Sequence, residues 1–416
     1  MLVQGTLQLP GDKSISHRAI MLTAIADGIS YVRNLNDGAD LQSTINILKD
    51  CRASTHQRDG EIVINGKELH SPSNNLDCGN SGTTTRLVAG LLASQKLTFS
   101  LIGDESLSKR PMKRIITPLT AMGCKIFSND GLLPLSIDAS DGISAIDYDM
   151  KVASAQVKSS ILFSALGGNN VSSINEIIPT RNHSEIMLKN MGALIESEGS
   201  KIIVHPLKSK LKSIDISVPS DPSSAAFFVA LAVINNNSNL KLINVLLNET
   251  RIGFVKVLNK MNCLISKSNE SIHNGEKVGD LIISSSNLKA IEVEPEIIPS
   301  IIDEVPILAV VAAFANGTTV FKNVEELKYK ECDRLNAIIH NLEAFGIKAY
   351  EKNNDLFVEG GKVKRMPKIT TFDDHRIAMA FTILSLTSFE KYELDNIQCV
   401  DISLPNFFNY LSEVTK

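Results

Sequence analysis

Positively charged side chains recur at the predicted starts of apolar helices. In the stretch LPGDKSISHRAIML, residues 9–22, Lys13 and Arg18 lie between a Pro-Gly turn and an apolar run. A helix start offers unpaired backbone N–H groups and a partial positive charge, and both favour anions. NSGTTTR, residues 80–86, repeats the pattern, and Gly82 allows a ligand to approach the main chain closely. The two stretches therefore indicate binding of an anion such as a phosphate or carboxylate.

Three later stretches carry further charged side chains. They are GDESLSKRPMKR (103–114), KYKECDRLNAI (328–338) and FDDHRIAMAF (372–381). Each feature also has a purely structural explanation, because Ser, Thr, Asn and Gly are the usual helix caps, basic runs are often solvated surface, and opposite charges pair at helical spacing. Capping alone does not explain why Lys or Arg recurs beside the caps. The repetition therefore favours an anion-binding site.

The composition limits the class of protein. The chain has 416 residues, of which 43% are hydrophobic, and a formal net charge of −4. This charge gives no overall attraction to nucleic acid or anionic lipid, so anion recognition must be local. Six scattered cysteines without a C-x-x-C pair, and a start unlike a signal peptide, indicate a reducing, cytoplasmic location. We expect no nucleic-acid or membrane partner.

Two common phosphate and metal motifs do not fit. A nucleotide P-loop requires Gly directly before its Lys, whereas Asp12 precedes Lys13. The eight histidines form no H-E-x-x-H motif or comparable cluster. We therefore expect no cofactor and no catalytic metal.

The chain also contains an internal repeat. Six segments share a polar start, an apolar helix, a Gly/Asn/Ser turn and a β-branched strand. The segments begin near Asp12, Asn80, Val152, Pro219, Pro299 and Asp373. Their spacing leaves room for a second helix in each, as in DLQSTINILKDCRA and RLNAIIHNLEAFGIKAY. This pattern predicts two α/β domains of three units each.

Eight stretches of the sequence resemble, in order, the signature stretches of the 5-enolpyruvylshikimate-3-phosphate synthase family. They are PGDKSISHRA, NSGTTTR, DESLSKRPM, ASAQVKS, SDPSSAAFF, DEVPILAV, KECDRL and DDHRIAMAF. The resemblance implies an α/β fold of the α+β type, in which each of two similar domains has three βαβαββ units around a pseudo-threefold axis. It also implies one domain of residues 12–220, a second of residues 1–11 and 221–416, and an active site in the cleft between them.

The resemblance further implies a reaction and its residues. The enolpyruvyl group of phosphoenolpyruvate would pass to the 5-hydroxyl of 3-phosphoshikimate, with release of phosphate. The residues implied for 3-phosphoshikimate are Lys13, Ser14, Arg18, Ser154, Ala155, Gln156, Asp303 and Lys330. Those implied for phosphoenolpyruvate are Lys13, Gly82, Arg110, Gln156, Arg334 and Arg376.

Proton transfer requires a base at the hydroxyl and an acid-base group at C3 of phosphoenolpyruvate. Asp303 is our candidate base, with helix capping as its structural alternative. Glu331, supported by Lys13, is our candidate at C3, and the sequence leaves open which of these two moves the proton. Arg181 and His375 are secondary candidates, because TRNHSEIML resembles a segment found in only part of the family.

Some features depart from one branch of the family, and other functions remain open. Leu87 stands where that branch has Pro, and ISLPNFF (402–408) lacks a Lys which the same branch uses on phosphoenolpyruvate.

One alternative function is enolpyruvyl transfer to UDP-N-acetylglucosamine, but the loop 103–114 lacks the Cys usual in those enzymes. Another is a non-catalytic phosphometabolite-binding protein of the same fold, which would need the arginines but neither Asp303 nor Glu331.

Overall fold

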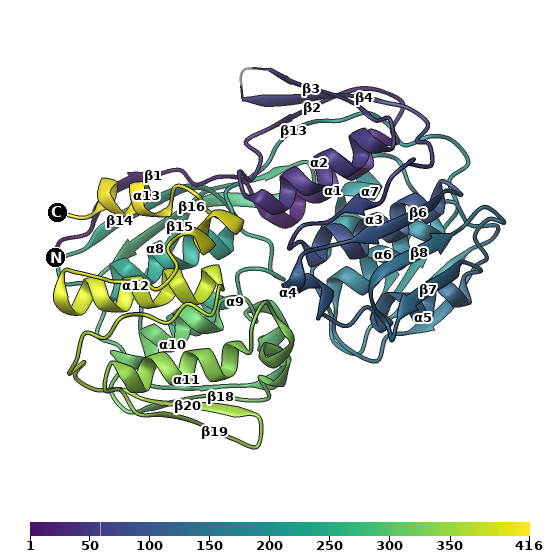
Figure 1. Ribbon diagram of the computed structural model, residues 1–416. Helices are drawn as coiled ribbons and strands as arrows, with labels where there is room; N and C mark the ends of the chain where they lie inside the picture. The colour runs from purple at the N-terminus through teal and green to yellow at the C-terminus, as the bar shows by residue number, and fades with distance from the viewer. Residues whose placement is uncertain (59) are drawn as a thin grey trace. The chain divides into compact units, whose positions relative to one another are not determined.

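The computed structural model describes residues 1–58 and 60–416 (Figure 1). It divides into two compact units, of which unit 1 comprises Met1–Asp12 with Pro219–Lys416 and unit 2 comprises Lys13–Val218. Helices alternate with small mixed sheets along both units, which is the predicted α/β fold class.

The described part of unit 2 contains three four-stranded sheets of one topology. Their strand orders are β13-β2-β4-β3, β5-β6-β8-β7 and β9-β10-β12-β11. The first two strands of each sheet run parallel and the other neighbours antiparallel. The strands are β2 (Gly28–Arg33), β3 (Ser54–Arg58), β4 (Glu61–Gly66), β5 (Leu76–Asp77), β6 (Thr98–Ile102), β7 (Lys125–Asn129), β8 (Leu132–Asp138), β9 (Asp147–Asp149), β10 (Ser172–Asn175), β11 (Ile195–Glu198), β12 (Lys201–Val204) and β13 (Asp215–Ser217).

Three helices of unit 2, α1, α3 and α6, are buried over nearly all their residues and begin at the predicted anion-binding stretches. The helices α3 and α6 pack closely, since a Cβ on Gly90 would lie 2.2 Å from the Ser160 carbonyl oxygen. The side chains of Ser81 and Ser154 cap α3 and α6. The helices of this unit are α1 (Lys13–Ala24), α2 (Ala39–Asp50), α3 (Gly82–Ser94), α4 (Glu105–Ser108), α5 (Lys113–Ala121), α6 (Ala155–Ala165) and α7 (His183–Asn190).

Unit 1 repeats this plan with two complete sheets among its described residues, β1-β14-β16-β15 and β17-β18-β20-β19. The helices α8, α10 and α12 lie between the two sheets (Figure 1). Because α8 and α10 are buried on all sides, they are apolar all round. The strands are β1 (Gln4–Leu7), β14 (Asn239–Leu246), β15 (Leu264–His273), β16 (Glu276–Ser284), β17 (Glu292–Val293), β18 (Thr318–Phe321), β19 (Ala349–Lys352) and β20 (Asp355–Glu359). The helices are α8 (Pro222–Ile234), α9 (Gly253–Lys260), α10 (Val305–Ala313), α11 (Arg334–Ala344), α12 (His375–Phe389) and α13 (Phe407–Val414), with 3₁₀ turns η1 (Pro295–Ser300), η2 (Glu325–Tyr329) and η3 (Gln398–Ile402).

The sixth predicted segment has a reduced form. It keeps the central helix α12 and one parallel bridge, between Ile369 and Leu394. The chain then forms η3 and α13, where an antiparallel hairpin follows in the complete units. The spacing of the buried Phe407, Leu411 and Val414 explains the difference, because apolar residues at intervals of three and four favour a helix.

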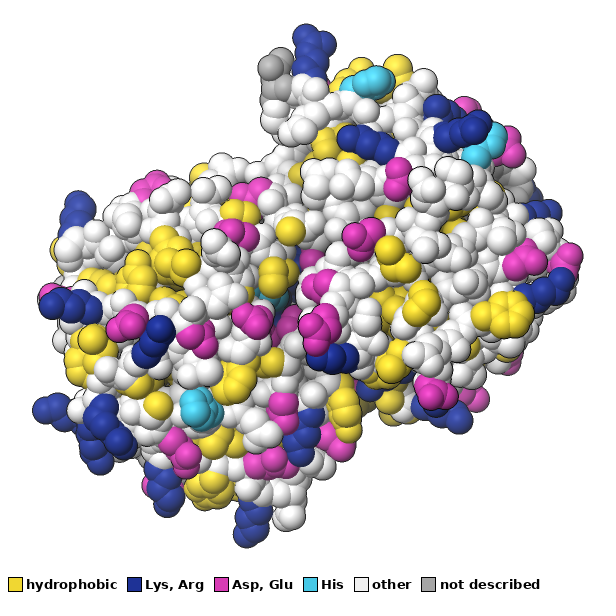
Figure 2. All heavy atoms as spheres, in the orientation of Figure 1, with side chains coloured by type: hydrophobic (Ala, Val, Ile, Leu, Met, Phe, Trp, Pro, Cys, Tyr) yellow, Lys and Arg dark blue, Asp and Glu magenta, His cyan; other side chains and the backbone are white. Residues whose placement is uncertain are grey.

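The surface mixes charges of both signs. Figure 2 shows Lys and Arg side chains interspersed with Asp and Glu over the visible face. This agrees with the small net charge of the chain. Across residues 1–58 and 60–416, no helix combines the length and apolar character needed to cross a bilayer.

Candidate active site

The start of α1 places three predicted residues of unit 2. Lys13 Nζ lies 2.5 Å from Asp40 Oδ2 of α2, and both side chains remain partly exposed. Arg18 is 2% exposed, and its Nη1 donates to the Ser14 carbonyl at 2.9 Å. Its Nε donates to the Ser184 hydroxyl at 2.7 Å and its Nη2 to the Ser159 hydroxyl at 2.8 Å, so one guanidinium joins α1 to α6 and α7.

The starts of α3 and α6 meet through polar side chains. Gln156 accepts a hydrogen bond from Arg86 Nη1 at 2.8 Å and donates one to the Thr83 hydroxyl at 2.9 Å. A Cβ on Gly82 would lie 2.6 Å from the same Arg86 nitrogen, so glycine lets the guanidinium reach the helix start. Ala155 is the first residue of α6 and presents its backbone there. These contacts bring together residues that the sequence placed on separate motifs.

Arg110 is held beside the start of α3. Its Nη2 donates to Asn80 Oδ1 at 2.6 Å and to the Ser106 hydroxyl at 3.2 Å. Asn80 in turn donates to Asp104, the cap of α4, at 2.7 Å. Arg110, which belongs to the basic run at 103–114, is therefore 9% exposed and held in place by hydrogen bonds.

A buried lysine that the sequence did not single out supports the segment around Arg181. Lys158 is 0% exposed, and its Nζ lies 3.1 Å from Glu176 Oε2 and 2.7 Å from Glu185 Oε1. Glu176 also accepts from the Thr180 backbone N–H at 3.0 Å, directly before Arg181. Lys158 and its two glutamates thus connect α6 to the segment that carries this arginine and to α7.

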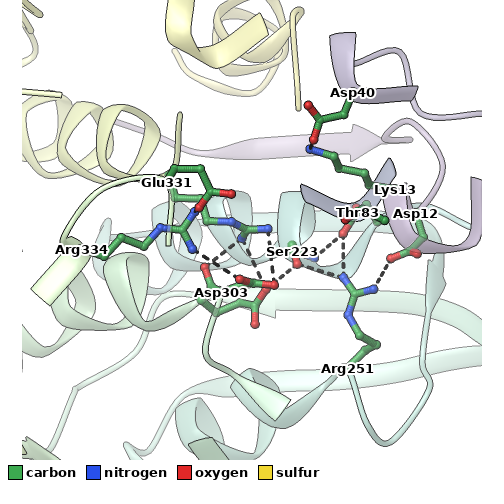
Figure 3. Close-up of polar contacts among 12 residues, drawn as sticks. Asp12, Lys13, Asp40, Thr83, Ser223, Arg251, Asp303, Glu331 and Arg334 are labelled. Carbon is green, nitrogen blue, oxygen red and sulfur yellow. Dashed lines mark hydrogen bonds and ion pairs between the residues drawn. The ribbon is translucent and has the colours of Figure 1, made fainter. Parts of the chain in front are cut away.

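In unit 1, Arg334 is the centre of a charged cluster at the start of α11 (Figure 3). It is 1% exposed. Its Nε donates to Asp374 at 2.7 Å, its Nη2 pairs with Glu331, and its Nη1 lies 3.4 Å from Asp303. Burial by itself would lower the pKa of Arg334, but Asp374, Glu331 and Asp303 raise it above its ordinary value, so this guanidinium stays charged.

Arg376 contacts the other side of Asp303. Its Nη1 donates to the Asp303 carbonyl at 2.8 Å, and its Nη2 lies 3.9 Å from Asp303 Oδ2. Glu304 lies 3.6 Å from Nη1 of the same arginine. Asp303, Glu331, Arg334 and Arg376 are therefore gathered in unit 1.

Three neighbouring residues differ in their suitability for chemistry. Burial of the Lys330 ammonium lowers its pKa, although Asp303 and Glu326 oppose the shift. Burial, together with the Asp374 carboxylate 3.6 Å away, raises the pKa of Cys332, so its thiol is a poor nucleophile. His375 is the first residue of α12 and is 3% exposed, so it is buried like Arg18 and Arg334.

Arg251 is the main residue of this region that sequence reasoning missed. It is 2% exposed, and its Nη1 donates to Asp12 at 2.5 Å, while its Nη2 lies 3.2 Å from Asp221 and 2.9 Å from the Ser223 hydroxyl. Asp221 caps α8. The surrounding stretch NETRIGF resembles an ordinary polar turn, so only the short spacing of Asp221 and Ser223 in SDPSS hinted at a polar cluster.

The described side chains offer anion-binding and proton-transfer groups but no metal site. Across residues 1–58 and 60–416, no group of three or more His, Cys, Asp or Glu residues could hold a metal ion. Guanidinium groups suit bidentate contacts to carboxylates and phosphates, and an ammonium supplies a point charge. Arg334 and Arg376 can bind anionic groups, and the neighbouring Asp303 and Glu331 carboxylates can accept and donate protons.

Comparisons with known proteins agree with this chemistry. The model of a family described as EPSP synthase (3-phosphoshikimate 1-carboxyvinyltransferase) matches residues 2–411. A 3-phosphoshikimate 1-carboxyvinyltransferase of Clostridium tetani is 41% identical over 99% of this chain and 94% of its own length. Its counterpart in Oceanobacillus iheyensis is 42% identical over 100% and 97%.

Solved structures show the same relationship. An EPSP synthase from Acinetobacter baumannii has a TM-score of 0.88 and 36% identity, covering 99% of this chain and 96% of that one. The enolpyruvyl transferase NikO from Streptomyces tendae, at 14% identity and a TM-score of 0.78 over 99% and 95% of the two chains, shares the fold.

Proposed function

Because the chain belongs to the EPSP synthase (3-phosphoshikimate 1-carboxyvinyltransferase) family, we propose that the residues described above carry out enolpyruvyl transfer. The reaction joins the 5-hydroxyl oxygen of 3-phosphoshikimate to C2 of phosphoenolpyruvate and releases inorganic phosphate. One observation supports this assignment most strongly. The Asp303 carboxylate lies 3.4 Å from Arg334 and 3.9 Å from Arg376, which pairs a candidate base with two cations for an anionic substrate.

The substrate contacts follow from the helix starts. We assign the phosphate of 3-phosphoshikimate to the α6 start and its carboxylate side to the α1 start, where backbone N–H groups and cations favour anions. Asp303 and Lys330 are assigned to its hydroxyls. The residues assigned to 3-phosphoshikimate at the helix starts are Lys13, Ser14, Arg18, Ser154, Ala155 and Gln156. Those assigned to phosphoenolpyruvate are Lys13, Gly82, Arg110, Gln156, Arg334 and Arg376. Arg181 and His375 stay secondary site candidates without an assigned substrate.

The proposed mechanism has two balanced steps. Asp303 accepts the proton of the 5-hydroxyl while its oxygen attacks C2 of phosphoenolpyruvate and C3 gains a proton from Glu331 or Lys13. The C3 proton then returns to the same group as the C2–O bond to phosphate breaks, and the proton held by Asp303 passes to the released phosphate, which regenerates the base. Proton transfer in both steps requires these groups within hydrogen-bond reach of the reacting atoms.

Phosphate release tests the assignment. We expect release with phosphoenolpyruvate and 3-phosphoshikimate together, and none with either alone. Transfer to UDP-N-acetylglucosamine instead, or hydrolysis of phosphoenolpyruvate alone, would contradict it.

The charged cluster of unit 1 should separate binding from proton transfer. Glu331→Gln keeps an acceptor for Arg334 but loses proton transfer, so kcat should fall roughly 10²-fold while both substrates still bind. Arg376→Gln should mainly raise the KM for phosphoenolpyruvate. Glu325→Gln, an exposed change in η2, is the control. Normal kinetics in the folded Glu331 and Arg376 variants would show that the cluster is only structural.

We also propose that the protein works as a monomer in the cytoplasm. Its six cysteines are free thiols, and five of them are buried, which suits a reducing compartment. Sedimentation of the purified protein at several concentrations tests the monomer, and a mass that rises with concentration would contradict it.

A further inference from the structure

The hydroxyl of Ser223 joins two charged groups of unit 1 (Figure 3). It accepts a hydrogen bond from Arg251 Nη2 at 2.9 Å and donates one to Glu304 Oε1. Ser223 is 4% exposed and Glu304 is 1% exposed. A guanidinium can only donate and a carboxylate can only accept, so the direction of this hydroxyl is fixed by its two partners.

The same oxygen of Glu304 also faces Arg376. The distance from Glu304 Oε1 to Arg376 Nη1 is 3.6 Å, longer than a hydrogen bond. The Nη1 group donates instead to the Asp303 carbonyl at 2.8 Å. The Ser223 hydroxyl therefore donates to the same carboxylate oxygen that faces Arg376, while Arg376 donates to the Asp303 carbonyl.

We propose that Ser223 is a positioning residue for Arg376. By bonding to Glu304, it keeps that carboxylate from drawing the guanidinium away from the Asp303 carbonyl. Without the hydroxyl, Glu304 would pair more closely with Arg376, because a buried carboxylate that loses a donor gains most from the nearest cation. The inference rests on the proposed function, in which Arg376 binds phosphoenolpyruvate.

The experiment compares Ser223→Ala with Ser223→Thr and with Ser224→Ala. Ser224 is the matched control, since it is the next residue of α8 and is 7% exposed. In Ser223→Ala we expect the KM for phosphoenolpyruvate to rise roughly tenfold, the scale of one hydrogen bond to a charged group, with the KM for 3-phosphoshikimate little changed. Ser223→Thr keeps the hydroxyl and should restore most of the affinity. Ser224→Ala should leave both constants near wild type.

A second variant examines the role of Glu304. Adding Glu304→Gln to Ser223→Ala removes the charge that would draw on Arg376, so the KM for phosphoenolpyruvate should return toward wild type. If Ser223→Ala does not fold, Ser223→Cys repeats the comparison with a weaker hydrogen bond.

Each outcome has one interpretation. An active wild type with unchanged KM values in Ser223→Ala, or equal losses in the Ser223 and Ser224 variants, overturns the inference alone. A wild type that releases no phosphate from the two substrates together overturns the proposed function instead.

Discussion

Each unit buries a basic side chain between two carboxylates, but the two sites hold different parts of the chain. In unit 1, Arg251 lies 2.5 Å from Asp12 and 3.2 Å from Asp221. In unit 2, Lys158 lies 3.1 Å from Glu176 and 2.7 Å from Glu185. Each site has the same formal charges, one cation and two carboxylates.

The difference lies in what each cation connects. Arg251 joins Asp12, the last residue of the first segment of unit 1, to the cap of α8 and to the Ser223 hydroxyl. The planar guanidinium can donate in several fixed directions at once. Lys158 instead joins neighbouring elements of one repeat and donates to the Thr180 carbonyl at 3.4 Å. An arginine therefore organises a network of distant segments, whereas a lysine secures a local one.

The largest expected effect is that of Arg251→Met. The change leaves Asp12, 0% exposed, and Asp221, 5% exposed, without their shared cation. Removing one partner of a buried charge cluster costs about 3–5 kcal/mol, so the urea midpoint should fall strongly. Arg33→Met is the control, because Arg33 is 44% exposed and its pairs with Glu61 and Asp215 lie at the surface. Equal midpoints for the two variants would contradict a special role for Arg251.

Lys158→Met should cost less, about 3 kcal/mol. Glu176 keeps its hydrogen bonds from the Thr180 N–H at 3.0 Å and hydroxyl at 2.5 Å, which offset part of the loss. Adding Glu185→Met removes the second charge and should recover some of the stability, because a buried pair replaced by apolar side chains is often neutral. If the two changes simply add, the loss does not come from an unpaired carboxylate.

The sequence predicted the repeated elements better than their polar connections. The apolar run PSSAAFFVALAVI after Asp221 indicated a buried, capped helix, and the structure has α8 at Pro222–Ile234. Local patterns set such elements, since cap and apolar run lie side by side in the chain. The reduced sixth segment was not predicted, because its helix α13 depends on a local period that the shared repeat pattern obscured.

The candidate site shows the same limit. Motif resemblance predicted Asp303, Glu331, Arg334 and Arg376, and these four lie in one cluster. Arg251 was missed because its partner Asp12 is 239 residues away in sequence. Lys158 was missed because a lysine within a helix is usually solvated. Long-range pairing of charges depends on the folded topology, which no local spacing encodes.

Lys330 gives the smallest expected effect and extends the comparison to a third cation, which is half-buried. Burial lowers the pKa of Lys330, and Asp303 and Glu326 oppose this only in part. In the free enzyme, Lys330 should therefore lose its proton below the ordinary lysine pKa of about 10.4. The pKa of Lys330 is lower in the folded protein than in the unfolded chain, which keeps the ordinary value. Between these two pKa values the unfolded chain binds more protons, so the contribution of Lys330 to the free energy of unfolding rises with pH.

The affinity for 3-phosphoshikimate should instead fall as pH rises, because we assign the charged form of the Lys330 ammonium to binding this substrate. The kcat/KM for this substrate, measured at saturating phosphoenolpyruvate, should decline as pH rises through the lowered pKa of Lys330. Lys330→Arg stays protonated and should move the decline to higher pH. Lys328→Arg is the matched control, since the hydrogen bond that Lys328 donates to Glu351 raises the pKa of Lys328, and it should leave the profile in place. If Lys330→Arg leaves the decline where it is in the wild type, another group limits binding at alkaline pH, and burial of Lys330 has no effect on substrate recognition.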